Sequence, residues 1–551
     1  MLEPQLTPFH YLCAVFGIFT TLLTFVSFLV KERFFISDSL LSYLVGVVVG
    51  PAATGLFNVH AWTSSAAELE SVTLEFTRLS LCIQVILAGI QLPPRFAKHA
   101  WRSMLTMLLP GMVCMWLISS LLVWAICVLP QSGEDSSTTT VRRMPFLHAL
   151  AIGSCLAPTD PILASTIIKG RWADEHVPAP LAQIISGESG ANDGLGYPFL
   201  FLALYLIAYV GGDGQYAATE GGASTAMAHF FGNTVAFVVL LGAVWGGLAG
   251  YVCAKVLRMA RRLHYVDQES FFAFPVLLAI FLIGTCGLAG SDDILAAFVA
   301  GNALSWTDWF RHETANDSFG TTVDMFLNVA LFIYLGAVCP WGSFQYVAAS
   351  GSPTMAAEAV LPLWRLVCLA LAILALRRLP VLLAFHKLGL LEPHVKTMRQ
   401  AAFMGFFGPM GVSSIFYVHE ILRFCRKDLS GDDGTLRPDV QYLPRAAETI
   451  VWFIVTCSIV VHGLAIPTYQ MGVAVWMQAW PGNREHPERH HYSFKGFVQR
   501  ESYALHSAWE KFEEGEHHAV EQLEAGLQRR LRARPGFRQI KSDAGSQRGE
   551  W

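Results

Sequence analysis

The feature of the sequence that most constrains its fold is a series of long apolar stretches. About a dozen runs of roughly 18 or more residues carry almost no charge, and a helix of that length crosses the hydrocarbon core of a bilayer. Hydrophobic residues make up 53% of the chain and charged residues 15%, whereas soluble domains carry about 25% charged residues. The sequence therefore predicts an all-α polytopic membrane protein embedded in a lipid bilayer. A formal net charge of −4 gives no indication of a nucleic-acid partner.

The loops between the apolar stretches predict thirteen membrane spans. Cytoplasmic loops are usually rich in Lys and Arg, and basic loops alternate here with loops that lack both, although loop 421–446 breaks the pattern with five basic residues. The alternation predicts an outside N-terminus and a cytoplasmic tail at 481–551, which is expected to form an amphipathic helix on the inner leaflet or a helix docked on the loops. The expected spans are about 10–30, 38–57, 70–92, 103–129, 145–168, 180–209, 229–253, 271–289, 293–306, 323–339, 358–378, 399–420 and 447–475.

Two of these spans contain residues that interrupt a helix. The fifth contains "CLAPTDPILA" and the twelfth contains "GFFGPMGVSS". Proline removes a backbone donor, and unwound backbone at membrane depth is tolerated only inside protein or along a water-filled cavity. If spans one to six and eight to thirteen form two inverted repeats, each break lies in the fifth helix of its half. Such matched breaks predict crossed broken helices around a transporter binding site. The residues concerned are Pro158, Thr159, Asp160, Pro161, Gly408 and Pro409.

The sixth span begins with an Asn-Asp pair in "GESGANDGLGYPF". A carboxylate inside a span is by default a functional-site hypothesis. We expect Asp193 to bind a small hard metal cation through oxygen, with Asn192 adding a carbonyl oxygen or steadying the empty carboxylate. Burial disfavours the charged form of a carboxylate and a bound cation favours it. Such a group holds either a proton or a cation, and competition between them is the basis of antiport.

Glu188 lies five residues before Asp193, about 140° around the helix, so the two do not share a face. We interpret Glu188 as structural and expect an arginine partner at the end of span eleven, either Arg377 or Arg378, with Arg399 behind them. Ser189 beside it allows close helix packing.

Other charged residues lie near the start of spans three and nine. Glu75 and Arg78 are spaced to pair with each other on span three. Asp292 and Asp293 follow Ser291 at the head of span nine. Two interpretations of these aspartates stay open: acids that cap the helix start, or groups that take part in cation access or proton coupling.

Several segments together resemble one family. "APTDPILA", "GESGANDGLGYPF", "GSDDILAAFVAGNALSW", "FLNVALFIYLGAVCPW", "FFGPMGVSSIFY" and "VVHGLAIP" look like fungal plasma-membrane Na+/H+ antiporters of the monovalent cation/proton antiporter superfamily, over nearly all of residues 10–475. The resemblance implies a homodimer with a dimerisation part (about 1–92 and 229–340) and a mobile core (about 103–209 and 358–478). It also implies that the ion binds at Asp193, with Asp160 and Thr159 lining the same site.

The resemblance implies a secondary transporter, not an enzyme, without a cofactor. The expected activity is exchange of Na+, and also Li+ and K+, for H+, serving sodium extrusion and pH homeostasis at the plasma membrane. An Asn-Asp pair further implies electroneutral exchange. Two alternatives stay open, a K+/H+ exchanger of an internal membrane and a Na+-coupled solute symporter. An intramembrane protease is excluded because the chain lacks the Tyr-Asp and His-Glu-x-x-His motifs of the aspartyl and zinc classes.

Overall fold

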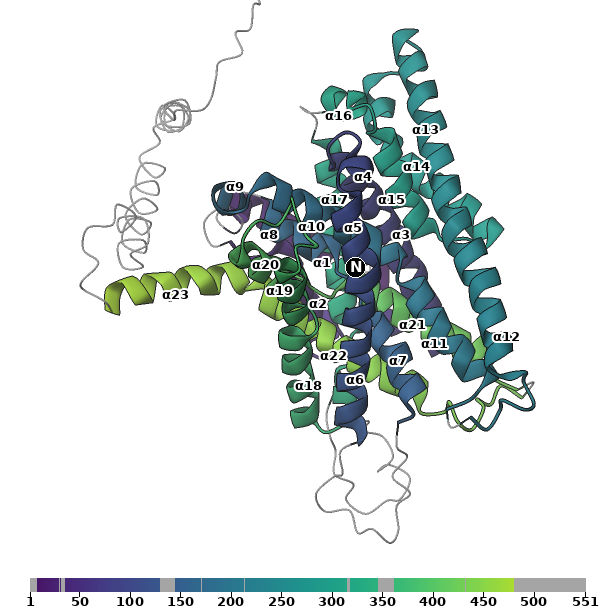
Figure 1. Cartoon of the computed structure of the whole chain (residues 1–551). Coiled ribbons are helices and arrows are strands. Elements are labelled where there is room, and N and C mark those ends of the chain that lie inside the picture. The colour runs from purple at the N-terminus through teal and green to yellow at the C-terminus, as the bar shows by residue number, and fades with distance from the viewer. Residues whose placement is uncertain are drawn as a thin grey trace, which may run out of the picture. The chain divides into compact units, whose positions relative to one another are not determined.

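The computed structural model is helical, and its helices follow one another closely along the chain (Figure 1). It describes residues 7–28, 30, 35–128, 144–169, 171–212, 214–314, 318–344, 361–431 and 433–479. The predicted tail, 481–551, lies outside these ranges. The helices are α1 (Pro8–Phe28), α2 (Asp38–Val49), η2 (Val59–Trp62), α3 (Ala66–Gln91), α4 (Phe96–His99), α5 (Trp101–Thr106), η3 (Met107–Gly111), α6 (Met112–Val128), α7 (Phe146–Cys155), α8 (Pro161–Ile168), α9 (Arg171–His176), α10 (Ala179–Gly194), α11 (Tyr197–Tyr209), α12 (Gly222–His229), η4 (Phe230–Leu240), α13 (Leu241–Arg262), α14 (Gln268–Ala289), α15 (Asp293–Leu304), α16 (Trp309–Glu313), α17 (Phe319–Val338), η5 (Trp341–Phe344), α18 (Leu363–Leu376), α19 (Leu379–Lys387), α20 (Met398–Phe406), α21 (Val412–Asp428), α22 (Leu443–Gly463) and α23 (Ala465–Ala479).

A helix, or a run of consecutive helices, lies at each of the thirteen predicted spans. Among the described residues, nine helical stretches are long and apolar enough to cross a bilayer. The prediction of an all-α polytopic membrane protein is therefore confirmed. The number of crossings and the inverted repeats stay predictions.

Predicted boundaries were wrong in four spans, and the seventh was expected to end at 253, whereas α13 continues to Arg262. The second span was expected to reach residue 57, but α2 ends at Val49 because Gly50 and Pro51 follow, and a residue before proline disfavours helical backbone. The twelfth was expected to end at 420, but α21 continues to Asp428 because its last turns carry charged residues, which a search for apolar runs misses. The thirteenth divides at Leu464 into α22 and α23.

The chain divides into two units, residues 1–467 and residues 468–551. The described part of the second unit is the stretch 468–479, which is helical as part of α23. All the contacts discussed below lie within the first unit.

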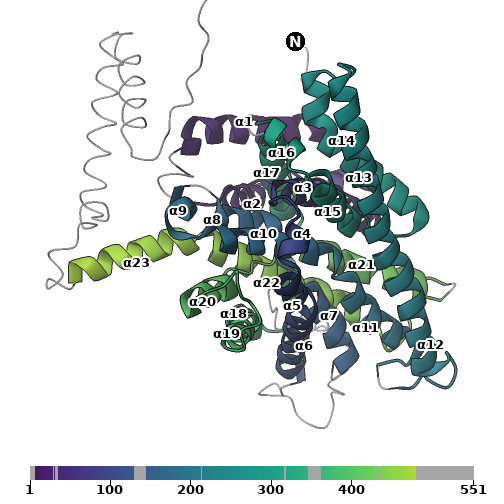
Figure 2. The same cartoon turned by 45° about the horizontal axis from the view of Figure 1, so that its top comes forward.

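We group helices of the first unit into two sets, which contact each other where α21 packs against α3. In the first set, which we call the scaffold helices, α15 packs against α13 and α3, and α17 packs against α2. In the second set, the site helices, α7 packs against α6 and α11, and α21 packs against α22. Helices α18, α19 and α20 also belong to the second set and lie together in both views (Figures 1 and 2). The division into a dimerisation part and a mobile core stays a prediction.

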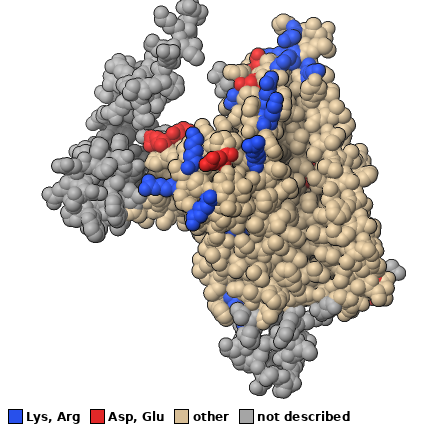
Figure 3. All heavy atoms as spheres, viewed as in Figure 1, with Lys and Arg blue, Asp and Glu red and all other residues tan. Residues whose placement is uncertain are grey.

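Charged side chains gather at one end of the visible surface (Figure 3). Arg258, Arg261 and Arg262 belong to the C-terminal end of α13, which lies at the top of Figure 1. Below this end the visible surface carries few charges, as a bilayer requires of surface that faces its lipid. Exposed apolar residues such as Phe237 and Val244 belong to η4 and α13. The basic end agrees with the predicted cytoplasmic side.

Three glycines at intervals of four residues bring α13 into backbone contact with α15. A Cβ atom added at Gly246 or Gly250 would collide with the carbonyl oxygen of Ala296 or Ala300, and one at Gly242 would lie 2.6 Å from that of Asp292. Small residues at this spacing let membrane helices approach closely. The glycines therefore hold two scaffold helices together.

We expect Gly246→Val to destabilise the folded protein by about 3 kcal/mol, at the upper end of the cost of overpacking a core, because backbone fills the space. Gly247→Val is the matched control, since the nearest atom to its added Cβ would be a methyl of Val299 at 3.5 Å. Thermal unfolding of the purified proteins in detergent measures both. Equal melting temperatures for the two variants would contradict the assignment.

Candidate ion-binding site at two crossed helix breaks

The two predicted helix breaks are present and touch each other. Helix α7 ends at Cys155 and α8 begins at Pro161, while α20 ends at Phe406 and α21 begins at Val412. The backbone N–H of Asp160 in the first break donates to the carbonyl oxygen of Pro409 in the second, at 2.9 Å. One backbone hydrogen bond thus joins the two broken helices where both are unwound. Four helix ends meet at this point.

Asp160 caps the start of both half-helices. Its Oδ1 accepts from the N–H groups of Ile162 (2.8 Å) and Leu163 (3.0 Å) at the start of α8. Its Oδ2 accepts from Val412 N–H (2.5 Å) at the start of α21. Gly411 allows this approach, because a Cβ there would collide with the carboxylate. A negative charge at two helix N-termini is favourable because the first N–H groups have no partner inside the helix.

Arg377 does the same for the carbonyl groups on the other side of the breaks. Its guanidinium donates to the carbonyl oxygens of Leu156, which follows α7, and Gly408, which follows α20. A third bond reaches the carbonyl oxygen of Pro158 at 3.3 Å. Arg377 is buried, with 2% of its surface exposed. One carboxylate and one guanidinium therefore form hydrogen bonds with free backbone groups at all four helix ends.

Asn192 ties α10 to the first break. Its Nδ2 donates to Thr159 Oγ1 at 2.8 Å, and its Oδ1 accepts from Thr159 N–H at 3.2 Å. The hydroxyl of Ser189 contacts the same Thr159 Oγ1 at 3.2 Å. The predicted residues Asn192, Thr159 and Ser189 are thus brought together. The amide oxygen of Asn192 accepts from the backbone of Thr159, and its role as a cation ligand stays a prediction.

Asp193 differs from its neighbours because its carboxylate is left unsatisfied. The residue is fully buried, yet neither carboxylate oxygen has a hydrogen-bond partner of normal geometry among the described residues. The carboxylate of Asp160 and the hydroxyl of Ser413 are the groups that act on it electrostatically. An isolated buried carboxylate is costly unless it is protonated or binds a cation.

The sequence analysis missed two residues of α21 that face Asp193. The hydroxyl of Tyr417 donates to the backbone carbonyl oxygens of Asp193 and Gly194. Ser413 lies four residues earlier, on the same face of the helix. Its hydroxyl is buried and has no hydrogen-bond partner among the described residues. The signal was present in "GVSSIFY", where Ser and Tyr follow the second break at helical spacing.

Glu188 forms a buried ion pair with Arg378. Its Oε1 and Oε2 accept from Nη1 and Nη2 of Arg378 at 2.6 and 2.7 Å, in the two-bond arrangement that suits a guanidinium. Arg378 Nε also donates to Met404 O at 3.0 Å. Of the two neighbouring arginines expected as partners, Arg378 binds Glu188 and Arg377 binds the carbonyl ends.

Asp292 and Asp293 lie at the start of α15 among the scaffold helices. Asp292 Oδ1 accepts from Leu295 N–H at 2.9 Å, as a helix cap does. Asp293 lies 3.7 Å from Arg78 of α3. The capping interpretation thus describes Asp292. The alternative of a role in cation access is not tested by this geometry.

Known proteins resemble this chain in sequence and in structure. The family model described as sodium/hydrogen exchanger, transmembrane, matches residues 18–471. The chain is 32% identical over 474 residues to Na(+)/H(+) antiporter 2 of Zygosaccharomyces rouxii, covering 85% of this chain and 54% of that protein. It is 32% identical over 474 residues to the Na(+)/H(+) antiporter of Saccharomyces cerevisiae, covering 84% and 44%. The chain thus spans about half the length of these two relatives.

A solved structure shows the same fold. The sodium proton antiporter MjNhaP1 from Methanocaldococcus jannaschii superimposes with a TM-score of 0.57, covering 84% of this chain and 97% of that one, at 14% sequence identity.

We expect Glu188→Gln and Arg378→Gln each to lower stability by about 3–5 kcal/mol, because each leaves a buried charge without its partner. The double variant should lose less than the sum of the two, since neither charge then remains. Melting temperatures of the purified proteins in detergent provide the test. A double variant whose loss equals that sum would show that the two side chains do not interact.

Proposed function

The chain belongs to the sodium/hydrogen exchanger family, and we propose that it exchanges Na+ for H+ across a membrane with Asp193 as the carrier. The observation that carries this proposal is the buried, unsatisfied carboxylate of Asp193 beside the crossed breaks. Its polar neighbours Asp160, Asn192 and Glu188 all have protein partners. Asp193 is therefore the group free to take up a cation or a proton.

The chemistry of the site supports exchange by competition. A buried carboxylate is stabilised by a proton or by a cation, and it does not hold both comfortably. If the site opens to one side of the membrane at a time, each crossing carries one Na+ or one H+. Because one carboxylate moves one positive charge in each direction, we propose electroneutral exchange. The relatives are named Na(+)/H(+) antiporters, which supports the choice of ions.

Ser413 supplies a second oxygen for the cation in this proposal. Hard cations bind oxygen ligands, and the unpartnered hydroxyl of Ser413 lies beside the Asp193 carboxylate. Li+ and K+ are proposed as further substrates. Plasma-membrane location, the homodimer and the cytoplasmic tail also stay proposals.

We expect Asp193→Asn to fold and to lose exchange, because an amide binds neither the proton nor the cation as a carboxylate does. The full chain in liposomes with an internal pH dye, under imposed Na+, Li+ or K+ gradients at zero voltage, gives the flux. Undiminished flux in Asp193→Asn would overturn the carrier assignment.

Asp292→Asn tests whether Asp292 takes part in proton coupling. Asn caps a helix as well as Asp, so lost flux in this variant would assign Asp292 to coupling. Flux that follows an imposed voltage would contradict electroneutral exchange.

We expect Ser413→Ala to raise the Na+ concentration for half-maximal flux about tenfold, the equivalent of about 1.4 kcal/mol for one lost oxygen contact. Ser414→Ala is the matched control, because Ser414 is equally buried and its hydroxyl also has no hydrogen-bond partner in the described structure. Ser414 points about 100° away around α21. Equal Na+ dependence in the two variants would remove Ser413 from the site.

A further inference from the structure

Helices α3 and α21 bring the scaffold helices and the site helices into direct contact. Two ion pairs cross this contact. Arg78 of α3 lies 3.1 Å from Glu420 of α21, and Arg426 of α21 pairs with Glu70 of α3. The order of the partners shows that the helices run antiparallel here. Helix α3 supplies the base in the first pair and the acid in the second.

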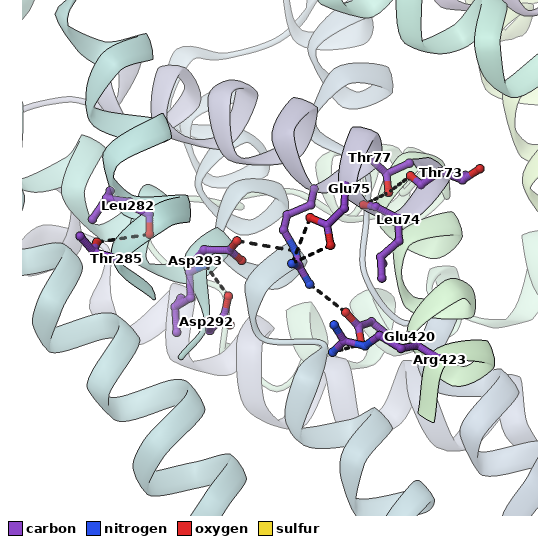
Figure 4. A network of polar contacts seen from close by, with 12 residues as sticks. Thr73, Leu74, Glu75, Thr77, Leu282, Thr285, Asp292, Asp293, Glu420 and Arg423 are labelled. Carbon is purple, nitrogen blue, oxygen red and sulfur yellow. Dashed lines mark hydrogen bonds and ion pairs between the residues drawn. The ribbon is translucent and has the colours of Figure 1, made fainter. Parts of the chain in front are cut away.

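The Arg78–Glu420 pair is the buried one of the two. Glu420 has 1% of its side chain exposed and Arg78 has 16%. Arg78 pairs with Glu75, Asp293 and Glu420, and Figure 4 shows these three acids around one point, with Arg423 next to Glu420. The ring of Phe416 packs against the guanidinium, 5.6 Å from its carbon atom. Charge and packing thus join the two sets of helices at one point.

Each member of the buried pair has a second partner in its own set of helices. Arg78 lies 3.2 Å from Glu75 on α3 and 3.7 Å from Asp293 on α15, both scaffold helices. Glu420 lies 2.7 Å from Arg423 on α21. If α3 and α21 separated, neither charge would be left alone, which is the usual reason that breaking a buried pair is costly. Separation of α3 from α21 therefore avoids the cost of leaving a buried charge without a partner.

The pairs also lie on one side of the proposed carrier. Tyr417 binds the backbone of Asp193, and Glu420 and Arg426 follow it toward the C-terminal end of α21. On α3, Cys82 is fully buried one turn beyond Arg78, on the same face and on the side away from Glu70. The two ion pairs thus separate Asp193 from the end of α21. The predicted topology places this end outside.

We propose that the Arg78–Glu420 and Glu70–Arg426 pairs form a lock that closes the path between Asp193 and this side of the membrane and opens once in each transport cycle. The proposal rests on the proposed function. A slide of α21 by one turn, about 5.4 Å, would bring Arg423 level with Arg78, or Glu420 level with Glu75. Both arrangements replace the buried Arg78–Glu420 attraction by a like-charge contact, although the first also brings Arg426 level with Glu75, so the lock favours the present position of the site helices.

A reversible cross-link tests whether the contact must open. Glu70→Cys/Arg426→Cys in the full chain is joined with a short bifunctional thiol reagent that a reductant cleaves, and Na+-driven proton flux is measured in liposomes. We expect at least a tenfold loss of flux on cross-linking and recovery on reduction. Arg258→Cys/Thr307→Cys is the matched control: this exposed contact at 2.6 Å lies within the scaffold helices, so its cross-link should leave flux unchanged. The variants Glu70→Cys and Arg426→Cys, each made alone, measure the loss of flux that comes from reaction with native cysteines. Undiminished flux in the cross-linked Glu70/Arg426 variant would overturn the lock.

A second measurement does not depend on transport. Arg78→Gln should open the lock and raise the rate at which a water-soluble thiol reagent modifies Cys82 at least fivefold, as followed by mass spectrometry. Arg78→Lys keeps the positive charge between Glu75, Asp293 and Glu420 and should leave the rate near that of the unmodified protein. An unchanged Cys82 rate in Arg78→Gln would contradict the lock. If no cation drives flux in the unmodified protein, the proposed function fails, and the Cys82 rates still decide whether the lock exists.

Discussion

The structure of the site depends on how two buried charges compensate unwound backbone. Breaking two helices inside a bilayer leaves N–H and C=O groups without water to bind them. Asp160 accepts from three of the N–H groups, and Arg377 donates to carbonyl oxygens on the opposite side of both breaks. Because each of these side chains serves both helices at once, neither break can move far without the other. The crossing is thus a rigid unit that can place a carrier group accurately.

The same compensation explains why Asp193 stands apart. Asp160 is committed to the half-helices, Asn192 to Thr159 and Glu188 to Arg378. Rigid neighbours leave the Asp193 carboxylate without a protein partner. In the proposed mechanism the transported ion and the proton supply the partner that the protein withholds. The support around the carrier is as important as the carrier, because a mobile neighbour would satisfy the carboxylate and remove its need for a cargo.

Much of this arrangement could be predicted from the sequence, and the remainder shows what a linear pattern leaves out. Pro158, Pro161 and Pro409 located the breaks because proline acts on its own backbone. Adjacent arginines could not be told apart, since Arg377 and Arg378 point about 100° from each other and their partners lie far away in the chain. The Arg78–Glu420 pair joins positions separated by 342 residues, so spacing suggested only the Glu75 partner. Ser413 was missed because the spacing of Ser and Tyr after the second break does not show which residue of another helix they face.

The charge pairing of the site helices has a consequence for the work done when they move. Carrying one elementary charge across a membrane potential of 100 mV costs about 2.3 kcal/mol. Asp160 and Arg377 carry opposite charges, and so do Glu188 and Arg378, and all four side chains are buried. If the site helices shift as a body, these four groups together draw no work from the electric field. Because the proposed exchange also moves one positive charge in each direction, a cell whose membrane has lost its voltage still drives it with a pH gradient alone.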